Sequence, residues 1–125
     1  MQTYQTYKGS CHCGTVQFEV DTVLDKAAQC NCSICIRRNA VMHRIQPENL
    51  RILAGEDNLQ LYEFNTKTAK HYFCKTCGIY PFHRPRVAPD MVTVNVFCLE
   101  GVTRETLDDI EVGAFDGRTF STVDD

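Results

Sequence analysis

The clustering of cysteines constrains this chain more than any other feature of its sequence. Seven of its eight cysteines fall into three tight groups, with the spacings C-x-C, C-x-C-x-x-C and C-x-x-C. Short spacings of this kind are typical of metal sites, whereas disulfide frameworks belong mainly to small secreted domains. We therefore predict that the grouped thiols bind metal. The groups are Cys11 and Cys13, then Cys30, Cys32 and Cys35, and finally Cys74 and Cys77.

The first residues and the net charge of the chain allow predictions about the compartment and the partners of the protein. Residues 1–6 are polar and have neither an apolar core nor a small-residue cleavage site, so we predict no signal peptide and a cytoplasmic protein. No apolar run approaches the roughly 18 residues that span a membrane, so we expect no membrane partner. The net charge of -3 is opposite to the basic balance of nucleic-acid-binding domains.

The length and the hydrophobic periodicity predict one mainly β domain over residues 1–125. Residues 15–21 alternate, which predicts a half-buried strand with Val16, Phe18 and Val20 on one face. The strongest strand is predicted at residues 91–99. Its core face would carry Val92, Val94, Val96 and Cys98, and its other face Thr93, Asn95 and Phe97.

The remaining elements are short and separated by turn residues. One helix is expected at residues 104–110, with Thr103 as its N-cap. Many short strands and little helix favour a sandwich-like arrangement. The further strands are predicted at 40–46, 50–53 and 59–64, with a turn at 55–58.

Glycines follow two of the cysteine pairs directly and suggest tight turns. Residues i and i+2 of an extended strand lie nearly 7 Å apart, because each residue adds about 3.3 Å. Sulfurs that share a tetrahedral zinc lie about 3.8 Å apart, so the chain must bend at a C-x-C pair. Gly14 and Gly78 are where such a bend is cheapest, because glycine accepts positive φ. These pairs are therefore predicted to form zinc knuckles.

Seven grouped thiols divide most naturally into four and three. Four thiolates close a structural zinc site, whereas three leave a position for water or substrate, as in catalytic sites. Spacing alone does not say which group joins which. The triplet of Cys30, Cys32 and Cys35 could instead belong to an ordinary four-ligand site completed by His12 or His43.

Other reactive or charged residues allow plainer interpretations. Cys98 is expected to be a small buried hydrophobic residue and not an eighth ligand. None of the histidines at positions 12, 43, 71 and 83 is singled out as a catalytic base. Arg37 and Arg38 follow the triplet. They are either solvent-exposed charges, or they offset the negative charge of the thiolates or hold a substrate carboxylate.

Three motifs, in order and over nearly the whole chain, resemble the glutathione-dependent formaldehyde-activating enzyme family, which includes centromere protein V. The sequences 94–99 and Asp116-Gly117 also resemble the C-terminal part of that family. The motifs are Gly9-Ser10-Cys11-His12-Cys13-Gly14, Cys30-Asn31-Cys32-Ser33-Ile34-Cys35 and Tyr72-Phe73-Cys74-Lys75-Thr76-Cys77-Gly78-Ile79-Tyr80.

The resemblance implies a β-tent fold, in which folded-over antiparallel sheet is stapled by zinc. It implies two zinc ions per chain. The structural zinc would be held by Cys11, Cys13, Cys74 and Cys77, and the catalytic zinc by Cys30, Cys32 and Cys35. The implied activity is that of a carbon–sulfur lyase. Its substrates would be a small-molecule thiol, such as glutathione, and an aldehyde, such as formaldehyde.

The ligand set of the triplet favours this type of chemistry. Three thiolates leave zinc with a charge of about -1, which makes it a weaker Lewis acid than zinc held by three histidines. Such a site suits a soft ligand, namely a substrate thiol whose pKa it lowers. The alternative is a non-catalytic β-tent module that uses zinc for its fold and serves partner binding or thiol-redox sensing.

Overall fold

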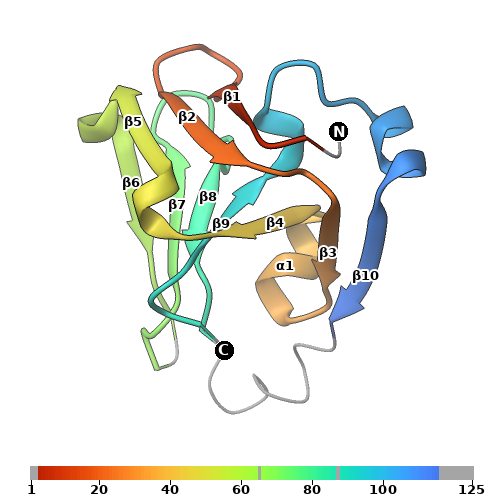
Figure 1. Ribbon diagram of the computed structural model, residues 1–125. Coiled ribbons are helices and arrows are strands. Elements are labelled where there is room, and N and C mark those ends of the chain that lie inside the picture. Colours follow the sequence, from red (N-terminus) through yellow and green to blue (C-terminus); the bar gives the residue numbers. More distant parts are fainter. Residues whose placement is uncertain (1–2, 65, 87, 116–125) are drawn as a thin grey trace.

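The computed structural model describes residues 3–64, 66–86 and 88–115, and over these ranges the protein is mainly β, as predicted. Its strands form two sheets (Figure 1). The smaller sheet has the order β1-β2-β5 and the larger the order β10-β3-β4-β9-β8-β7-β6. All strand pairs are antiparallel except β3 and β10, which are parallel. The smaller sheet contains β1 (Gln5–Ser10), β2 (Gln17–Thr22) and β5 (Leu50–Ala54).

The larger sheet is built from segments distributed over most of the chain, with short helices between them. Its strands are β3 (Lys26–Cys30), β4 (Met42–Ile45), β6 (Leu59–Tyr62), β7 (Lys70–Cys74), β8 (Phe82–Arg84), β9 (Val92–Asn95) and β10 (Glu111–Phe115). The helical segments are α1 (Ser33–Arg38) and the 3₁₀ helices Pro47–Asn49, Glu56–Asn58, Val96–Cys98 and Arg104–Asp109. No helix in these ranges is long and apolar enough to cross a membrane.

The main core lies between the two sheets. The predicted alternation in β2 is confirmed, because Phe18 and Val20 are fully buried, as is Val16 just before the strand. Phe18 meets Phe82 of β8 edge to face, with ring centroids 5.5 Å apart. Contacts of this kind bind the smaller sheet to the larger through apolar burial, the dominant favourable term in folding.

The predicted strands at 50–53 and 59–64 correspond to β5 and β6, which belong to different sheets. The turn between them therefore carries the chain from one sheet to the other. Gly55 has a φ of 78°, and the 3₁₀ helix Glu56–Asn58 follows it. Sequence periodicity located both strands and the turn but could not reveal the change of sheet, because strand partners are set by tertiary packing.

The predicted strand at 91–99 is correct only as far as Asn95. There the Asn95 side chain accepts a hydrogen bond from the backbone N–H of Phe97 at 3.2 Å and donates one to the carbonyl of Tyr80 at 3.0 Å. These bonds bend the chain into the 3₁₀ helix Val96–Cys98, so Cys98 does not share a strand face with Val94. Asparagine side chains compete in this way with ladder bonds.

Several elements of the described chain were not predicted from the sequence. These are β1, β3, β7, β8, β10 and α1, all of them short. The helix expected at 104–110 is a 3₁₀ helix, Arg104–Asp109. It begins after Thr103, whose N–H donates to Oγ1 of Thr106 at 3.0 Å. Asp116 and Gly117 lie outside the described residues.

We predict that Gly9→Ala destabilises the protein because the strand packs directly on Phe18. A Cβ at Gly9 would lie 2.3 Å from a ring carbon of Phe18, which is fully buried. Overpacking of this kind costs about 1–3 kcal/mol. Gly113→Ala is the matched control, because Gly113 is also in a strand and has nothing within 4 Å of the added carbon. Urea denaturation should show a lower unfolding free energy for Gly9→Ala alone. Equal effects of the two substitutions would contradict the prediction.

Candidate metal centres and an adjoining pocket

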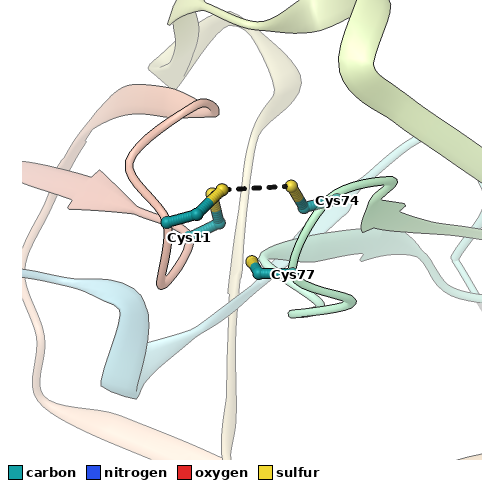
Figure 2. Close-up of side chains that lie close together, drawn as sticks. Cys11, Cys74 and Cys77 are labelled. Carbon is teal, nitrogen blue, oxygen red and sulfur yellow. Dashed lines mark hydrogen bonds between the residues drawn. The ribbon is translucent and has the colours of Figure 1, made fainter.

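Two segments of the chain that lie far apart in the sequence bring four cysteines together; Cys13 and Cys74 are 61 residues apart. Cys11 and Cys13 follow β1, whereas Cys74 ends β7 and Cys77 lies in the turn after it. Their sulfur atoms all lie within 4.8 Å of one another. Figure 2 shows Cys11, Cys74 and Cys77 directed toward a common centre from the two loops. This is the grouping that the family resemblance implied.

The sulfur separations fit a tetrahedral thiolate site. Sγ of Cys13 lies 3.6 Å from that of Cys11 and 3.7 Å from that of Cys74. Zinc–sulfur bonds of about 2.3 Å in a tetrahedron place sulfurs about 3.8 Å apart. A disulfide would need about 2.05 Å, and all eight cysteines are free thiols. This cluster could therefore hold a metal ion through four thiolates.

The turns around these cysteines also direct hydrogen-bond donors toward the sulfurs. Gly14 and Gly78 have φ of 84° and 77°, which confirms the positive φ predicted for both positions. The backbone N–H of Val16 points at Sγ of Cys11 at 3.3 Å, and that of Thr76 at Sγ of Cys74 at 3.4 Å. Nδ2 of Asn58 also lies 3.4 Å from Sγ of Cys74. Such donors offset the charge of metal-bound thiolates.

The cysteine triplet forms a second cluster at the junction of β3 and α1. Cys30 is the last residue of β3, Cys32 precedes the helix, and Cys35 lies within it. Their sulfurs lie within 4.8 Å of one another, so three thiolates could hold a second metal ion. Hydrogen bonds from the thiols of Cys30 and Cys35 lower the pKa of Cys32, and backbone N–H groups at the start of α1 act in the same direction. The surroundings of Cys32 therefore favour its thiolate form.

The possibility that a histidine completes the triplet is not supported in the part of the chain that the structure describes. No histidine joins either cluster, and His12 is exposed to solvent. His43 is engaged elsewhere, since its Nδ1 donates to the carbonyl of Lys26 at 2.7 Å and its Nε2 accepts from Thr22 at 2.8 Å. Burial lowers the pKa of His43. His43 is therefore a neutral structural residue that joins β4 to β2.

The triplet opens into a cavity of about 510 Å³, within the range of small-molecule sites. Cys30, Cys32 and Cys35 form one side of it. The four-cysteine cluster does not border this cavity. Apolar side chains contribute much of the wall, namely Ala27, Ala28, Ile34, Met42, Ala69 and Met91.

Another wall of the cavity is a row of polar residues that crosses four strands. His71 of β7 pairs with His83 of β8, His83 pairs with Thr93 of β9, and Thr93 pairs with Arg44 of β4. Directly paired residues point to the same face of a sheet. All four line the cavity, so this face of the larger sheet is its floor. The neighbouring register, with Phe82 and Val94, faces the main core instead.

Both histidines of this row are buried, and each is hydrogen-bonded to a polar side chain, His71 to Arg38 and His83 to Tyr80. Arg38 stacks over the ring of Tyr80 at 3.5 Å and its Nη1 lies 3.3 Å from Nδ1 of His71. Because an arginine can only donate, Nδ1 of His71 accepts and the neutral ring carries its proton on Nε2. The hydroxyl of Tyr80 hydrogen-bonds to Nδ1 of His83.

Both imidazoles are neutral at physiological pH. Burial, with the positive charge of Arg38 acting in the same direction, lowers the pKa of His71 to about 4. Burial, His71 and Arg38 lower the pKa of His83 to about 3. A negative charge on Cys32 acts in the opposite direction at both rings but does not outweigh burial. The two histidines of the row are therefore neutral, and Arg44 is its charged member.

The two arginines after the triplet have separate environments. Arg37 is exposed and its Nη1 donates to the carbonyl of Ser33 at 2.7 Å, so it is a helix-surface charge. Arg38 supports Tyr80 and His71 and places a positive charge beside the thiolates. Cys98 joins neither cluster, packs against the main core, and has its pKa raised to about 12 by burial.

Sequence reasoning missed His71, His83 and Thr93 as pocket residues. The alternation at 91–99 did place Thr93 opposite Val92 and Val94, but nothing in the sequence shows that this face borders a cavity. The two histidines meet Thr93 only through the register of three strands. Register between distant strands cannot be read from one sequence.

The chain is similar to known proteins over most of its length. The sequence model of the family described as "Glutathione-dependent formaldehyde-activating enzyme" matches residues 6–112. A crystal structure of a Rhodobacter sphaeroides protein, solved as a structural genomics target, is 46% identical in sequence. The match covers 86% of this chain and 99% of the other, with a TM-score of 0.79.

We predict that the two clusters differ in what they do for the fold. Cys11→Ser should remove one metal ion and lower the melting temperature by at least about 10 °C, because the four-cysteine cluster joins loops from distant parts of the chain. Cys32→Ser should also remove one metal ion but leave the melting temperature within a few degrees. Elemental mass spectrometry and calorimetry measure both quantities.

Cys98→Ser is the matched control for these substitutions, because Cys98 belongs to neither cluster. It should retain two metal ions per chain. Two metal ions in Cys32→Ser, or an unchanged melting temperature in Cys11→Ser, would contradict the assignment.

Proposed function

This chain belongs to the glutathione-dependent formaldehyde-activating enzyme family, and from that premise we propose that it is a zinc-dependent carbon–sulfur lyase. Its substrate would be the adduct of a small thiol and an aldehyde, with glutathione and formaldehyde as the pair to test first. The observation that carries the proposal is the opening of the cysteine triplet into a ligand-sized cavity. The other cluster has four thiols and does not border that cavity.

We assign the two clusters to different zinc ions. Cys11, Cys13, Cys74 and Cys77 would hold a structural zinc, because four thiolates fill its coordination sphere. Cys30, Cys32 and Cys35 would hold the catalytic zinc. When bound there, zinc supplies a soft Lewis acid that takes a sulfur ligand and favours its thiolate form at neutral pH.

The reaction conserves atoms and electrons without a redox step. The thiolate sulfur attacks the carbonyl carbon, a carbon–sulfur bond forms, and the π electrons of the carbonyl move to its oxygen. That oxygen takes up a proton, which replaces the one that the thiol has lost. The reverse reaction breaks the carbon–sulfur bond and returns thiol and aldehyde.

The residues around the triplet suit such a reaction. The apolar part of the wall lowers the polarity around the reacting carbon, which strengthens the electrostatic effects of nearby groups. Arg38 places a fixed positive charge near the triplet through its contacts with Tyr80 and His71. It acts as a positioning residue and does not line the cavity.

The charges around the cavity favour an anionic thiol. Lys26, Arg44 and Arg86 line it, with Glu111 as the acidic residue among the lining groups, although the whole chain has a net charge of -3. Basic side chains bind carboxylates through charge-assisted hydrogen bonds. Glutathione carries two carboxylates and so matches this charge distribution.

We predict that Cys32→Ser lowers kcat/KM for the adduct of glutathione and formaldehyde by at least about 100-fold, a loss of about 2.7 kcal/mol in transition-state stabilisation. Loss of the low-pKa thiolate removes a ligand from the catalytic cluster. The rate of adduct formation and breakdown can be followed by exchange NMR. Cys98→Ser should retain the wild-type rate, because its sulfur lies outside both clusters.

Wild-type activity in Cys32→Ser would contradict the proposal. Absence of turnover by the wild-type protein with a panel of thiols and aldehydes would favour the non-catalytic zinc module instead. In that case the number of metal ions bound per chain would still test whether both cysteine clusters bind metal.

A further inference from the structure

One buried polar group in the cavity has no partner in the described part of the chain. Thr93 is only 6% exposed and lines the cavity, and no described residue hydrogen-bonds to its Oγ1. A buried hydroxyl without a partner costs about 1–3 kcal/mol. Such groups are rare in folded proteins and call for an explanation.

None of the neighbours of Thr93 in the row hydrogen-bonds to its hydroxyl. In the cross-strand row Thr93 lies between His83 on β8 and Arg44 on β4. The arginine can only donate. Beyond His83 lies His71, whose Nδ1 faces Arg38 and whose proton is therefore on Nε2. Arg44 and His71 thus bring hydrogen-bond donors to the same wall of the cavity as Thr93.

A wall of donors suits an oxygen atom of a ligand. A hydroxyl such as that of Thr93 can both donate and accept, so it can pair with a carbonyl oxygen or with an alcohol. The sulfur of the ligand would meet the triplet, which borders the same cavity. An adduct of a thiol and an aldehyde carries an oxygen on the carbon next to sulfur.

We propose that Thr93, supported by the His71–His83 row, is the binding site for the aldehyde-derived oxygen of the substrate. This inference rests on the proposed function and adds the residue that selects for an oxygen beside the sulfur. The hydrogen bond is made only when the ligand is present. The cost of the unpaired hydroxyl is then recovered on binding, which makes the pocket selective for ligands that carry the oxygen.

Two substitutions distinguish the effect of the Thr93 hydroxyl from the effect of the side-chain shape. Thr93→Val keeps the branched shape and removes the hydroxyl, whereas Thr93→Ser keeps the hydroxyl. Thr106→Val is the matched control, because Thr106 is equally buried but its Oγ1 already accepts the N–H of Thr103 at 3.0 Å. The probes are thioacetic acid, which like the adduct carries an oxygen on the carbon bonded to sulfur, and ethanethiol, which has the same carbon chain without that oxygen.

In calorimetric titrations of the zinc-loaded proteins, the preference for thioacetic acid over ethanethiol should be about 3- to 10-fold larger in wild type than in Thr93→Val, the worth of one net hydrogen bond. Thr93→Ser and Thr106→Val should keep the wild-type preference. Without ligand, Thr93→Val should melt at the wild-type temperature or above, whereas Thr106→Val should melt below it. The stability comparison reports the hydroxyl of Thr93 independently of any ligand.

The outcomes distinguish this inference from the proposed function. If Thr93→Val keeps the wild-type preference between the two probes, the oxygen site is wrong and the lyase proposal stands. A melting temperature of Thr93→Val as low as that of Thr106→Val would show that the hydroxyl is already paired, and would also overturn the inference. Failure of wild type to bind either thiol would overturn both proposals.

Discussion

The meeting of Cys11 and Cys13 with Cys74 and Cys77 is the constraint on which the arrangement of this protein depends. The first pair follows the edge strand β1 of the smaller sheet, and the second follows β7 of the larger sheet. β1 is also joined to the segment after β9 by the isolated bridge between Gly9 and Leu99 and by a hydrogen bond from the N–H of Glu100 to the carbonyl of Lys8. A metal ion held by all four thiolates would fix the angle between the sheets at one corner.

The larger sheet uses its two faces for different purposes. One face packs against the smaller sheet through residues such as Phe82 and Val94, whereas the other carries the polar row and the cavity. Single-residue alternation along β8 and β9 is enough to separate these roles. A shift of one residue in either strand would exchange the apolar and polar sets, so the register that builds the core also builds the pocket.

The cysteine groups and the turns beside them could be predicted from the sequence because they depend on local spacing, whereas the joining of the first pair with the last followed from the family resemblance. The three cysteine groups, the turns at Gly14 and Gly78 and the apolar alternation around Phe18 follow from neighbouring residues. The helix α1 escaped prediction because it is six residues long and lies inside the triplet motif. The polar row escaped because its members come from four strands. The end of β9 at Asn95 depends on a bond to Tyr80, which sequence periodicity cannot show.

The parallel pairing of β10 with β3 has a consequence for the order of folding. β10 joins the edge of the larger sheet beside β3 and contributes Glu111 and Gly113 to the cavity. During synthesis the triplet therefore leaves the ribosome long before the strand that completes its surroundings. Until β10 docks, the three thiols stand at an open sheet edge without the finished pocket. Maturation of the site is thus a late, non-local event, and contacts between such distant segments form slowly.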